Sequence, residues 1–506
     1  MNTIRAAIVV FIASFCTLVI ELVAGRLLAP YVGVSLYTWT SIIGVVLAGI
    51  SAGAYAGGWL ADRRPLDSTL AWLLLASGAT SLLIAPATSL LAADDGWLTT
   101  LGLATTLVQR VVILSFLLFF LPCFFLGMIS PVAVKLAVRD LDSAGRVVGR
   151  IYAVSTLGSI AGTFTTGFYL IARFGTRATL IGTGIALIVT ALFVLLGRRG
   201  RAVIAALVAM AAIFAIFDRE PLLPPHREAL IEQDPLHVDE SQYYTIQVER
   251  TVREDNGAPL LALRLDHLLH SHTDLADPLH LEYGYLRLFN EVVAEAIRRH
   301  PSPRFLFIGG GGYTLPRRIA REHPEAEIDV VEIDAAVTRA AYRFLDAPRE
   351  ARTINEDARW FAMRAHDRYD AIFIDAFNDL SVPYHLTTRE FASRLRELLE
   401  PDGALVANVV DDFERGRFLA SYARTLQSVF GEPNVAVVME TEADMNSTRS
   451  TFVVAASANL LRFEQAHVLR DPRYLERGIV LTDDFAPVDN MLAPLFTERF
   501  VDEETE

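Results

Sequence analysis

The chain has 506 residues, of which 52% are hydrophobic and 21% are charged. This composition is too apolar for an ordinary soluble protein of this length, so we expect two or more domains with at least one in a lipid bilayer. Residues 1–217 carry 14 Lys and Arg against 7 Asp and Glu, whereas the remaining residues carry 31 against 52, which gives charges of +7 and −21. The acidic part lacks the basic face that nucleic acid requires, so we expect no nucleic-acid partner. Its charge suits a cationic substrate or serves solubility alone.

Cysteine, histidine and lysine usage excludes several kinds of site. Cys16 and Cys123 lie far apart in apolar runs, which rules out a disulfide framework and a cysteine-based metal site. The histidines form no H-E-x-x-H pattern, and we predict that the protein holds no metal. Lys135 is the only lysine and belongs to the apolar part. A Walker-type G-K-[ST] loop is therefore excluded, as is a lysine Schiff base in the acidic part.

Apolar stretches of roughly the 20 residues that a bilayer requires recur along residues 1–217. We predict spanning helices near 6–24, 39–60, 68–92, 111–134, 151–172 and 177–197. A seventh stretch, 202–217, has only 16 residues, and it spans, re-enters or lies at the surface. The first stretch lacks a small-residue cleavage site, so we do not expect a removable signal peptide.

Basic residues collect in alternate connections between these stretches, at Arg63 and Arg64, at 135–150 and at 198–201. Such loops stay in the cytoplasm, which places the N-terminus inside. Seven spans would then leave the acidic part outside, whereas six would leave it inside. The sequence predicts a multi-pass membrane protein and leaves the side of the acidic part open.

Two features of the predicted spans can be interpreted as structural or as functional. Gly49, Gly53 and Gly57 recur at four-residue spacing, which favours close approach of another helix. Glu21 lies near the end of the first span, and an ionisable residue there is a functional-site hypothesis. Pairing with Arg26 is the alternative for Glu21.

The pattern of the acidic part predicts a linker at 218–239, a small β region at 240–282 and an α/β domain at 283–495. Strands and helices alternate in the α/β domain, which predicts a parallel sheet and a Rossmann-like fold of the class I methyltransferase type. The expected fold class is thus a multi-pass α-helical membrane domain followed by this α/β domain. In the β region we expect paired strands at 243–250 and 260–269. In the α/β domain we expect helices at 283–299, 315–323, 335–345 and 389–399, and strands at 304–309, 327–334, 369–377 and 403–410.

Ligands of such sheets bind outside the carboxyl ends of the strands. Four consecutive glycines, Gly309 to Gly312, follow the first strand, and glycines allow a sharp turn with backbone N–H groups against a ligand. Glu332 ends the second strand, 23 positions after Gly309, where a carboxylate can accept both hydroxyls of a ribose. A helix N-cap or a surface acid is the alternative for Glu332.

Two further acids follow strands. Asp357 is placed to accept from an adenine amino group, and N-capping the helix that begins with Ala358 is an equally good reading. Asp375 lies near the end of the predicted strand 369–377, where a general base would face the reactive end of a nucleotide. The glycine loop departs from G-x-G-x-x-G because its sixth position is Thr314. One loop followed by three acids fits an adenosyl sulfonium donor better than a dinucleotide.

Four stretches of the acidic part carry a family resemblance: FLFIGGGGYTLPR (305–317), VVEID (330–334), NEDA (355–358) and FIDAFNDLSVPYHLTTREF (373–391). They resemble the spermidine synthase family, the polyamine aminopropyltransferases, over residues 240–430. ELVAGRLLAPYVG (21–33) and GGWLADRRP (57–65) resemble the membrane-fused bacterial branch of that family. In that branch a multi-spanning segment precedes the synthase-like domain.

The resemblance implies decarboxylated S-adenosylmethionine as co-substrate, with S-adenosylmethionine as the alternative. It implies Glu332 on the ribose and both Asp357 and Ala358 near the adenine. Gly309, Gly310 and Gly311 would lie under the aminopropyl arm.

The resemblance also implies an amine site. Asp375 matches the family's proton-accepting aspartate, and Tyr283 matches the tyrosine that orients the attacking amine. Asn378, Asp379 and His270 match positions near the polyamine.

Several positions depart from the family pattern on the amine side. Gly312 stands where the family has an aspartate after its glycines. Gly284 and Tyr285 stand in place of its His and Glu. Two glutamines near the substrate correspond to Tyr244 and His270.

These observations predict a membrane-bound aminopropyltransferase that acts on a small cationic polyamine such as putrescine. Its expected location is the bacterial cytoplasmic membrane, with the lipid bilayer and possible homodimerisation as interactions. One alternative is methyl transfer from S-adenosylmethionine to another acceptor. The other is a non-enzymatic polyamine transporter or sensor, supported by Glu21 and the glycine stripe.

Overall fold

The computed structural model describes residues 3–32, 35–92, 106–138, 140–196, 235–253, 255–377, 382–447, 449–459, 461–464, 466–469 and 472–497. The chain divides into a helical unit, Met1–Glu232 with Glu240–Thr245 and Arg499–Glu506, and an α/β unit, Gln233–Asp239 with Ile246–Glu498. The predicted stretch 202–217 and most of the predicted linker lie outside the described residues, as do Asn378 and Asp379. The predicted domain boundaries therefore stay predictions.

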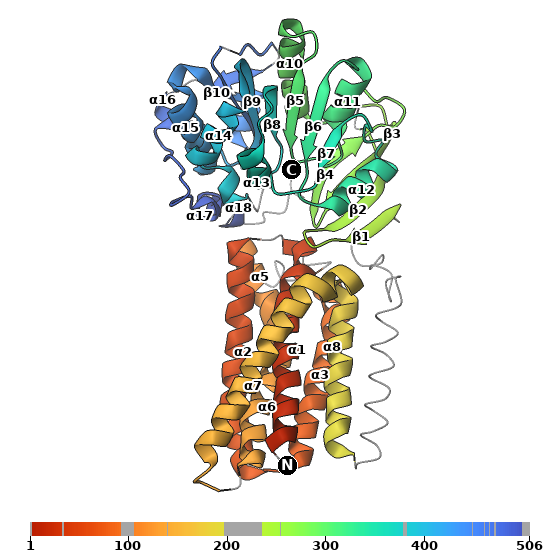
Figure 1. Cartoon of the computed structure of the whole chain (residues 1–506), viewed down its shortest axis with the longest axis vertical. Coiled ribbons are helices and arrows are strands. Elements are labelled where there is room, and N and C mark those ends of the chain that lie inside the picture. The colour runs from red at the N-terminus through yellow and green to blue at the C-terminus, as the bar shows by residue number, and fades with distance from the viewer. Residues whose placement is uncertain are drawn as a thin grey trace, which may run out of the picture. The chain divides into compact units, whose positions relative to one another are not determined.

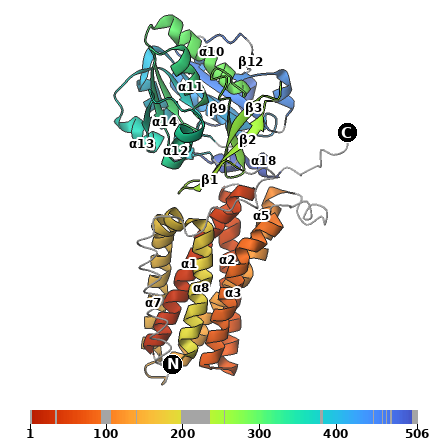
Figure 2. The ribbon, with the colours of Figure 1, turned by 90° about the vertical axis from the view of Figure 1, so that its right-hand side faces the viewer.

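Long apolar helices run alongside one another in the helical unit (Figures 1 and 2). They are α1 (Thr3–Val32), α2 (Leu36–Arg63), α3 (Asp67–Ala92), α5 (Leu107–Ser115), α6 (Leu121–Ala137), α7 (Ala144–Thr165) and α8 (Ile171–Leu195). The π-helical turns η1 (Phe116–Phe120) and η2 (Thr166–Leu170) join α5 to α6 and α7 to α8. Six helical segments in the described part are long and apolar enough to cross a membrane. They coincide with the six stretches expected from the sequence.

The glycine stripe of α2 forms a close contact with α6. A Cβ atom at Gly53 would overlap the carbonyl oxygen of Phe124, and one at Gly57 would lie 2.6 Å from the Cα atom of Met128. A Cβ at Gly49 would lie 2.9 Å from the carbonyl oxygen of Phe120. Small residues let two helix backbones approach to this separation. The packing interpretation of the stripe is therefore confirmed.

Replacing Gly53 by leucine should lower the melting temperature of the detergent-purified protein, because α2 and α6 would have to separate. Overpacking of this kind costs about 1–3 kcal/mol. Gly58 lies on the same helix, and a Cβ there meets no atom within 4 Å. Gly58→Leu is thus the matched control and should melt close to the unsubstituted protein. Equal losses in both variants would contradict the packing argument.

Glu21 lies on α1, and the pairing with Arg26 considered from the sequence is not formed. Within the described residues no ion pair or hydrogen bond of the Glu21 side chain is found. The functional hypothesis for Glu21 stays a prediction.

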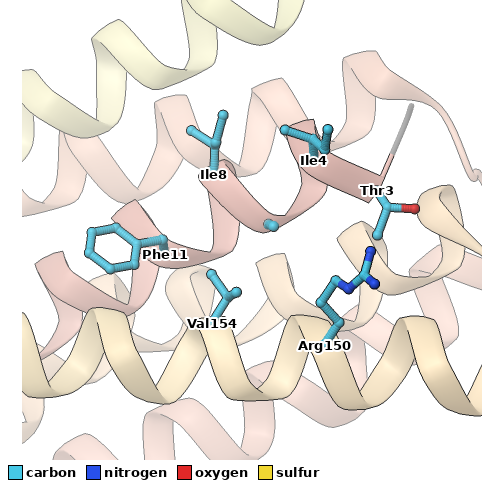
Figure 3. A pocket seen from close by; sticks show the side chains of 7 residues that line it. Thr3, Ile4, Ile8, Phe11, Arg150 and Val154 are labelled. Atoms are coloured by element: carbon cyan, nitrogen blue, oxygen red, sulfur yellow. The ribbon is translucent and has the colours of Figure 1, made fainter.

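A groove of about 330 Å³ lies between α1 and α7 (Figure 3). Its lining is Thr3, Ile4, Ala7, Ile8, Phe11, Arg150 and Val154. Most of these side chains are apolar, and the one ionised group among them is the Arg150 guanidinium. A cationic polyamine would meet like charge and no carboxylate there, so this groove does not favour the transport alternative.

Two sheets build the α/β unit, whose helices pack around the larger one (Figures 1 and 2). The small sheet has the order β1-β2-β3-β4, and the large sheet has the order β12-β10-β11-β9-β8-β5-β6-β7. The strands of the small sheet are β1 (His237–Glu240), β2 (Thr245–Val252), β3 (Pro259–Leu265) and β4 (Leu268–Thr273). Those of the large sheet are β5 (Arg304–Ile308), β6 (Glu327–Val331), β7 (Arg352–Ile354), β8 (Tyr369–Ile374), β9 (Leu399–Asp411), β10 (Val435–Met439), β11 (Ser450–Ser457) and β12 (His467–Leu469).

Helices alternate with the parallel strands as the sequence predicts. The longer ones are α10 (Gly284–Arg299), α11 (Thr314–Glu322), α12 (Ala335–Phe344), α13 (Ala358–Arg364), α14 (Arg389–Glu397) and α15 (Phe418–Phe430). The short segments are η3 (Tyr384–Leu386), η4 (Glu432–Asn434), η5 (Glu442–Asn446), α16 (Pro472–Leu475), α17 (Val488–Met491) and α18 (Ala493–Thr497). The core comes from apolar strand residues such as Phe305, Phe307 and Phe373, whose rings contact one another. The predicted Rossmann-like fold with a preceding β region is confirmed.

One predicted strand is wrong in its extent. Residues 260–269 form nearly all of β3, a turn and the start of β4, because Asp266 has a φ of 53°. Asp tolerates this left-handed conformation, which lets the chain reverse after Leu265. The small sheet therefore contains a β3–β4 hairpin, and His270 and Ser271 lie on its second strand, β4.

The order of the parallel strands places the predicted site. β5 pairs in parallel with β6 on one side and with β8 on the other, and β6 and β8 pair in parallel with β7 and β9. After β5 the chain adds β6 and β7 on one side of β5 and then adds β8 and β9 on the other side. Ligands of such sheets bind at this point, where the strand order reverses. The carboxyl ends of β5, β6, β7 and β8 therefore meet at one edge.

Candidate functional site

Two glycines of the loop after β5 have positive φ angles, which glycine adopts most readily. Gly309 has a φ of 99° and Gly311 a φ of 46°. A Cβ atom at Gly309 would also overlap the carbonyl oxygen of Asp375. Glycine at this position therefore lets the end of β5 and the end of β8 touch.

Glu332, directly after β6, is only 7% exposed and binds the glycine loop. Its Oε2 accepts from the N–H groups of Gly310 at 2.8 Å and Gly311 at 3.3 Å, and its Oε1 accepts from the N–H of Asp334 at 2.9 Å. Burial raises the pKa of Glu332, while these three backbone donors act in the opposite direction. Asp334 caps α12 by accepting from the Ala336 N–H, so the N-cap and surface-acid alternatives for Glu332 are wrong.

A carboxylate has about four lone-pair sites, so the Glu332 carboxylate can still accept ribose hydroxyls. The glycine N–H groups on Oε2 also fix the position of the loop relative to β6. A nucleoside bound here would thus meet a carboxylate whose orientation is already set.

Asp357 caps α13 and also faces a histidine. Its Oδ1 accepts from the Trp360 N–H at 2.9 Å, and its Oδ2 lies 3.0 Å from His385 Nε2. Burial alone would raise the pKa of Asp357, but the Trp360 N–H and His385 outweigh it and the pKa is lowered. The structural and the adenine-binding readings of Asp357 are compatible, and Ala358 is buried at the start of the same helix.

His385 lies in η3 and does not cap the helix that follows. The Thr388 side chain caps α14 by accepting from the Phe391 N–H at 3.3 Å. A capping role for His385 is therefore excluded, since its ring faces Asp357. Ile333, directly after Glu332, is 37% exposed and is a further apolar group beside these acids.

Asp375, directly after β8, is held by two neutral donors. Its Oδ2 accepts from the Tyr285 hydroxyl at 2.9 Å, and its Oδ1 accepts from the Asn408 Nδ2 at 2.9 Å. Burial raises the pKa of Asp375, and these two hydrogen bonds oppose that rise. Sequence reasoning missed both donors, although an asparagine inside the apolar run of β9 was a signal for Asn408.

Aromatic rings stand beside Asp375. The Tyr283 ring stacks on the Tyr285 ring at 5.8 Å and lies 5.2 Å from the His272 ring. The Tyr283 hydroxyl donates to the carbonyl oxygen of Leu269 at 3.3 Å, and burial raises the pKa of Tyr283 to about 12. Tyr283 thus stacks on the residue that donates to Asp375, although Tyr283 and Asp375 are far apart in the sequence.

His270 lies on β4, and burial lowers its pKa to about 4. It is therefore neutral at pH 7 and adds no positive charge against a cationic substrate. The other two predicted amine-site residues, Asn378 and Asp379, lie outside the described residues.

Two departures from the family pattern have a steric cause. A Cβ atom at Gly312 would overlap the Oγ of Ser271, which reaches the glycine loop from β4. A Cβ atom at Gly284 would overlap the carboxylate of Glu440, which pairs with Arg287. A side chain at Gly312 or Gly284 would therefore require Ser271 or the Glu440 carboxylate to move.

Gly312→Ala should lower the melting temperature and weaken adenosyl-ligand binding, because the loop must move away from Ser271. Overpacking costs about 1–3 kcal/mol. Ser271→Gly removes the obstructing side chain, so the double variant should be no less stable than Gly312→Ala alone. Additive losses in a double-mutant cycle of melting temperatures would show that the two residues do not meet.

Within the described ranges, no group of three or more His, Cys, Asp or Glu side chains is arranged to hold a metal ion. The absence of a metal stays a prediction. The arrangement around the strand ends offers acceptors for hydroxyls, amino groups and an ammonium, which fits a nucleoside and an amine.

Comparison with protein families matches residues 290–463 to the spermine/spermidine synthase domain. The polyamine aminopropyltransferase of Vibrio vulnificus is 39% identical over 139 residues, which are 26% of this chain and 46% of that protein. The polyamine aminopropyltransferase of Pyrobaculum calidifontis is 30% identical over 228 residues, which are 42% of this chain and 72% of that protein. Polyamine aminopropyltransferase 1 of Streptomyces coelicolor is 27% identical over 442 residues, which are 83% of this chain and 78% of that protein.

These alignments differ in how much of the chain they cover. The chain spans less than half the length of the V. vulnificus relative. The alignment with the S. coelicolor protein is longer than the part of the chain after residue 217, so it extends into the helical unit. A crystal structure of a probable spermidine synthase from Corynebacterium glutamicum has a TM-score of 0.43 and 23% identity, with 49% of this chain and 96% of that chain covered.

Proposed function

We propose that this chain, which belongs to the polyamine aminopropyltransferase family, moves an aminopropyl group from decarboxylated S-adenosylmethionine to a polyamine such as putrescine. The observation that carries the proposal is that Glu332 and Asp375 contact the glycine loop, while Asp357 follows β7 at the same edge of the sheet. Glu332 and Asp357 suit the ribose and the adenine, and Asp375 suits the amine.

The donor would lie along the strand ends. Glu332 would accept from the ribose hydroxyls, while Asp357 and Ala358 would bind the adenine edge. Gly309, Gly310 and Gly311 would lie under the aminopropyl arm, and a Cβ atom at Gly311 would meet no atom within 4 Å. When bound, the donor supplies a carbon bonded to a positively charged sulfur.

Transfer forms a bond from the amine nitrogen to that carbon and breaks the carbon–sulfur bond, whose electron pair stays on sulfur. The products are methylthioadenosine and the lengthened polyamine. An amine must be unprotonated to attack, so Asp375 would accept its proton and pass it to solvent. Tyr283 would help to orient the amine, and alignment at contact distance supplies much of the remaining acceleration.

The direct test uses the detergent-purified full chain with decarboxylated S-adenosylmethionine and putrescine, with products measured by mass spectrometry. We expect methylthioadenosine and spermidine in equal amounts. Neither product from a protein that still binds an adenosyl ligand would overturn the proposed transfer.

Methyl transfer to another acceptor is the second candidate, because the replaced positions Gly284 and Gly312 both lie on the amine side of the site. It would use the same nucleoside contacts with S-adenosylmethionine as the donor. Release of S-adenosylhomocysteine in the presence of S-adenosylmethionine would support this candidate over aminopropyl transfer.

The proposal includes a multi-pass location in the bacterial cytoplasmic membrane. The six apolar helices support it, since their lengths match the hydrocarbon core. Retention of the protein in the membrane pellet after alkaline carbonate extraction is the expected result. The transport alternative instead requires uptake of labelled spermidine into proteoliposomes that Glu21→Gln abolishes.

A further inference from the structure

The Asp375 carboxylate is held by one donor on each of its oxygens. The Tyr285 hydroxyl reaches Oδ2 from the first turn of α10, and the Asn408 Nδ2 reaches Oδ1 from the middle of β9. The residues are 90 and 33 positions from Asp375, so three separate elements meet at one carboxylate. A carboxylate fixed at both oxygens cannot rotate without breaking a hydrogen bond.

Both donors are held by their own surroundings. The Tyr285 ring stacks on Tyr283 at 5.8 Å and meets the Phe289 ring edge-on at 5.5 Å. Asn408 is 8% exposed, and its Oδ1 has no hydrogen-bond partner among the described residues. The favourable interaction of this amide is the hydrogen bond that its N–H group donates to Asp375, since its buried oxygen is unpaired and burial of an unpaired oxygen is unfavourable. The reverse orientation of this amide would set two oxygens against each other.

Neither donor brings a charge of its own to the carboxylate. Burial, followed by the neighbouring Asp375, raises the pKa of Tyr285 well above its usual value, so this phenol stays protonated. The other titratable group that faces Asp375 from this segment is Tyr283, which directly precedes α10, and the glycine loop presents only backbone to Asp375. In the described part of the chain, the side chains that donate to the Asp375 carboxylate are thus neutral.

We propose that Tyr285 and Asn408 are positioning residues that orient the Asp375 carboxylate towards the attacking amine. Each oxygen uses one lone pair on its protein donor and keeps another for the N–H groups of the substrate. This inference rests on the proposed aminopropyl transfer, and it adds two residues that act through Asp375.

Loss of one donor has two separable consequences. The carboxylate can rotate, which lowers kcat because the amine is no longer aligned with its base. The pKa of Asp375 also rises, because a hydrogen bond that favours the charged form is gone, so less carboxylate is present at a given pH. The acidic limb of the pH profile should therefore move to higher pH by about one unit.

The experiment compares the full-chain Tyr285→Phe and Asn408→Leu variants with the unsubstituted protein. We expect the acidic limb of kcat/KM to shift to higher pH in both, with kcat reduced and KM for the nucleoside donor unchanged. Infrared titration with labelled aspartate, in which Asp375→Asn identifies the band, should show the same upward shift of the carboxyl pKa. Two independent variants keep the test decisive where one of them fails to fold.

Tyr474→Phe is the matched control for the loss of a phenol. The Tyr474 hydroxyl is buried without a hydrogen-bond partner among the described residues, and its ring stacks on Phe413 at 4.4 Å. This variant should keep the pH profile of the unsubstituted protein. Unshifted profiles and an unshifted carboxyl titration in Tyr285→Phe and Asn408→Leu would overturn the inference.

The inference and the proposed function fail in different ways. Absence of methylthioadenosine from the unsubstituted protein would overturn the proposed transfer and leave the carboxyl titration to decide the roles of Tyr285 and Asn408. Normal turnover with an unshifted titration in both variants would overturn the positioning roles alone.

Discussion

Asp375→Asn should lower the rate of methylthioadenosine formation by about 10²–10⁴-fold, because the attacking amine loses its base. The change keeps the volume of the side chain, so the end of β8 and its contact with the glycine loop should persist. Binding of an adenosyl ligand, measured by calorimetry, should stay within a few-fold of the unsubstituted protein. The measurement for catalysis is single-turnover product formation with decarboxylated S-adenosylmethionine and putrescine.

Asp346→Asn provides the control for removal of a carboxylate from the same unit. Asp346 is exposed, pairs with Arg321 at 3.1 Å and has a φ of 54°, a conformation that asparagine also adopts. An exposed pair contributes at most about 1 kcal/mol, so turnover should not change. Full turnover in Asp375→Asn would remove this residue from its proposed role as base.

Glu332→Gln should weaken the binding of an adenosyl ligand by about 100-fold, since hydrogen bonds to a charged acceptor are lost at the ribose. It should also disturb the glycine loop. Oε2 accepts from Gly310 and Gly311, and Oε1 accepts from Asp334, so a glutamine NH₂ group would face a backbone donor in either orientation. The dissociation constant of an adenosyl ligand and the melting temperature measure the two effects.

Glu350→Gln is the matched control, because Glu350 is exposed and no hydrogen bond to its side chain is found in the described part of the chain. It should leave both the dissociation constant and the melting temperature unchanged. If Glu332→Gln bound the ligand as tightly as this control, the ribose would have to be held by other residues.

The three acids and the glycine loop of the candidate site were predictable because each of them follows a strand. Glu332, Asp357 and Asp375 lie at the ends of β6, β7 and β8 or in the turns after them. Parallel strands bring their carboxyl ends to one edge, so position along the chain was enough to group these acids. The same reasoning placed the glycine loop beside them.

The amine side was less predictable because its residues meet through non-local packing. Ser271 and Glu440 occupy the space of side chains that the family pattern leads one to expect at Gly312 and Gly284. Neither contact follows from spacing, since β4 and the segment after β10 approach the site only once the sheets are formed. The β3–β4 turn at Asp266, which the sequence reading missed, is what puts Ser271 on its own strand.

The sequence by itself determined the six apolar helices, the alternation of strands and helices, and the three acids at the strand ends. Periodicity and length carry these features, and they depend on residues close in the chain. Only the tertiary structure decided which groups hold Asp375 and which side chains fill the amine side. Those contacts join α10, β8, β9 and β4, and local sequence carries no signal for distances between elements that are far apart in the chain.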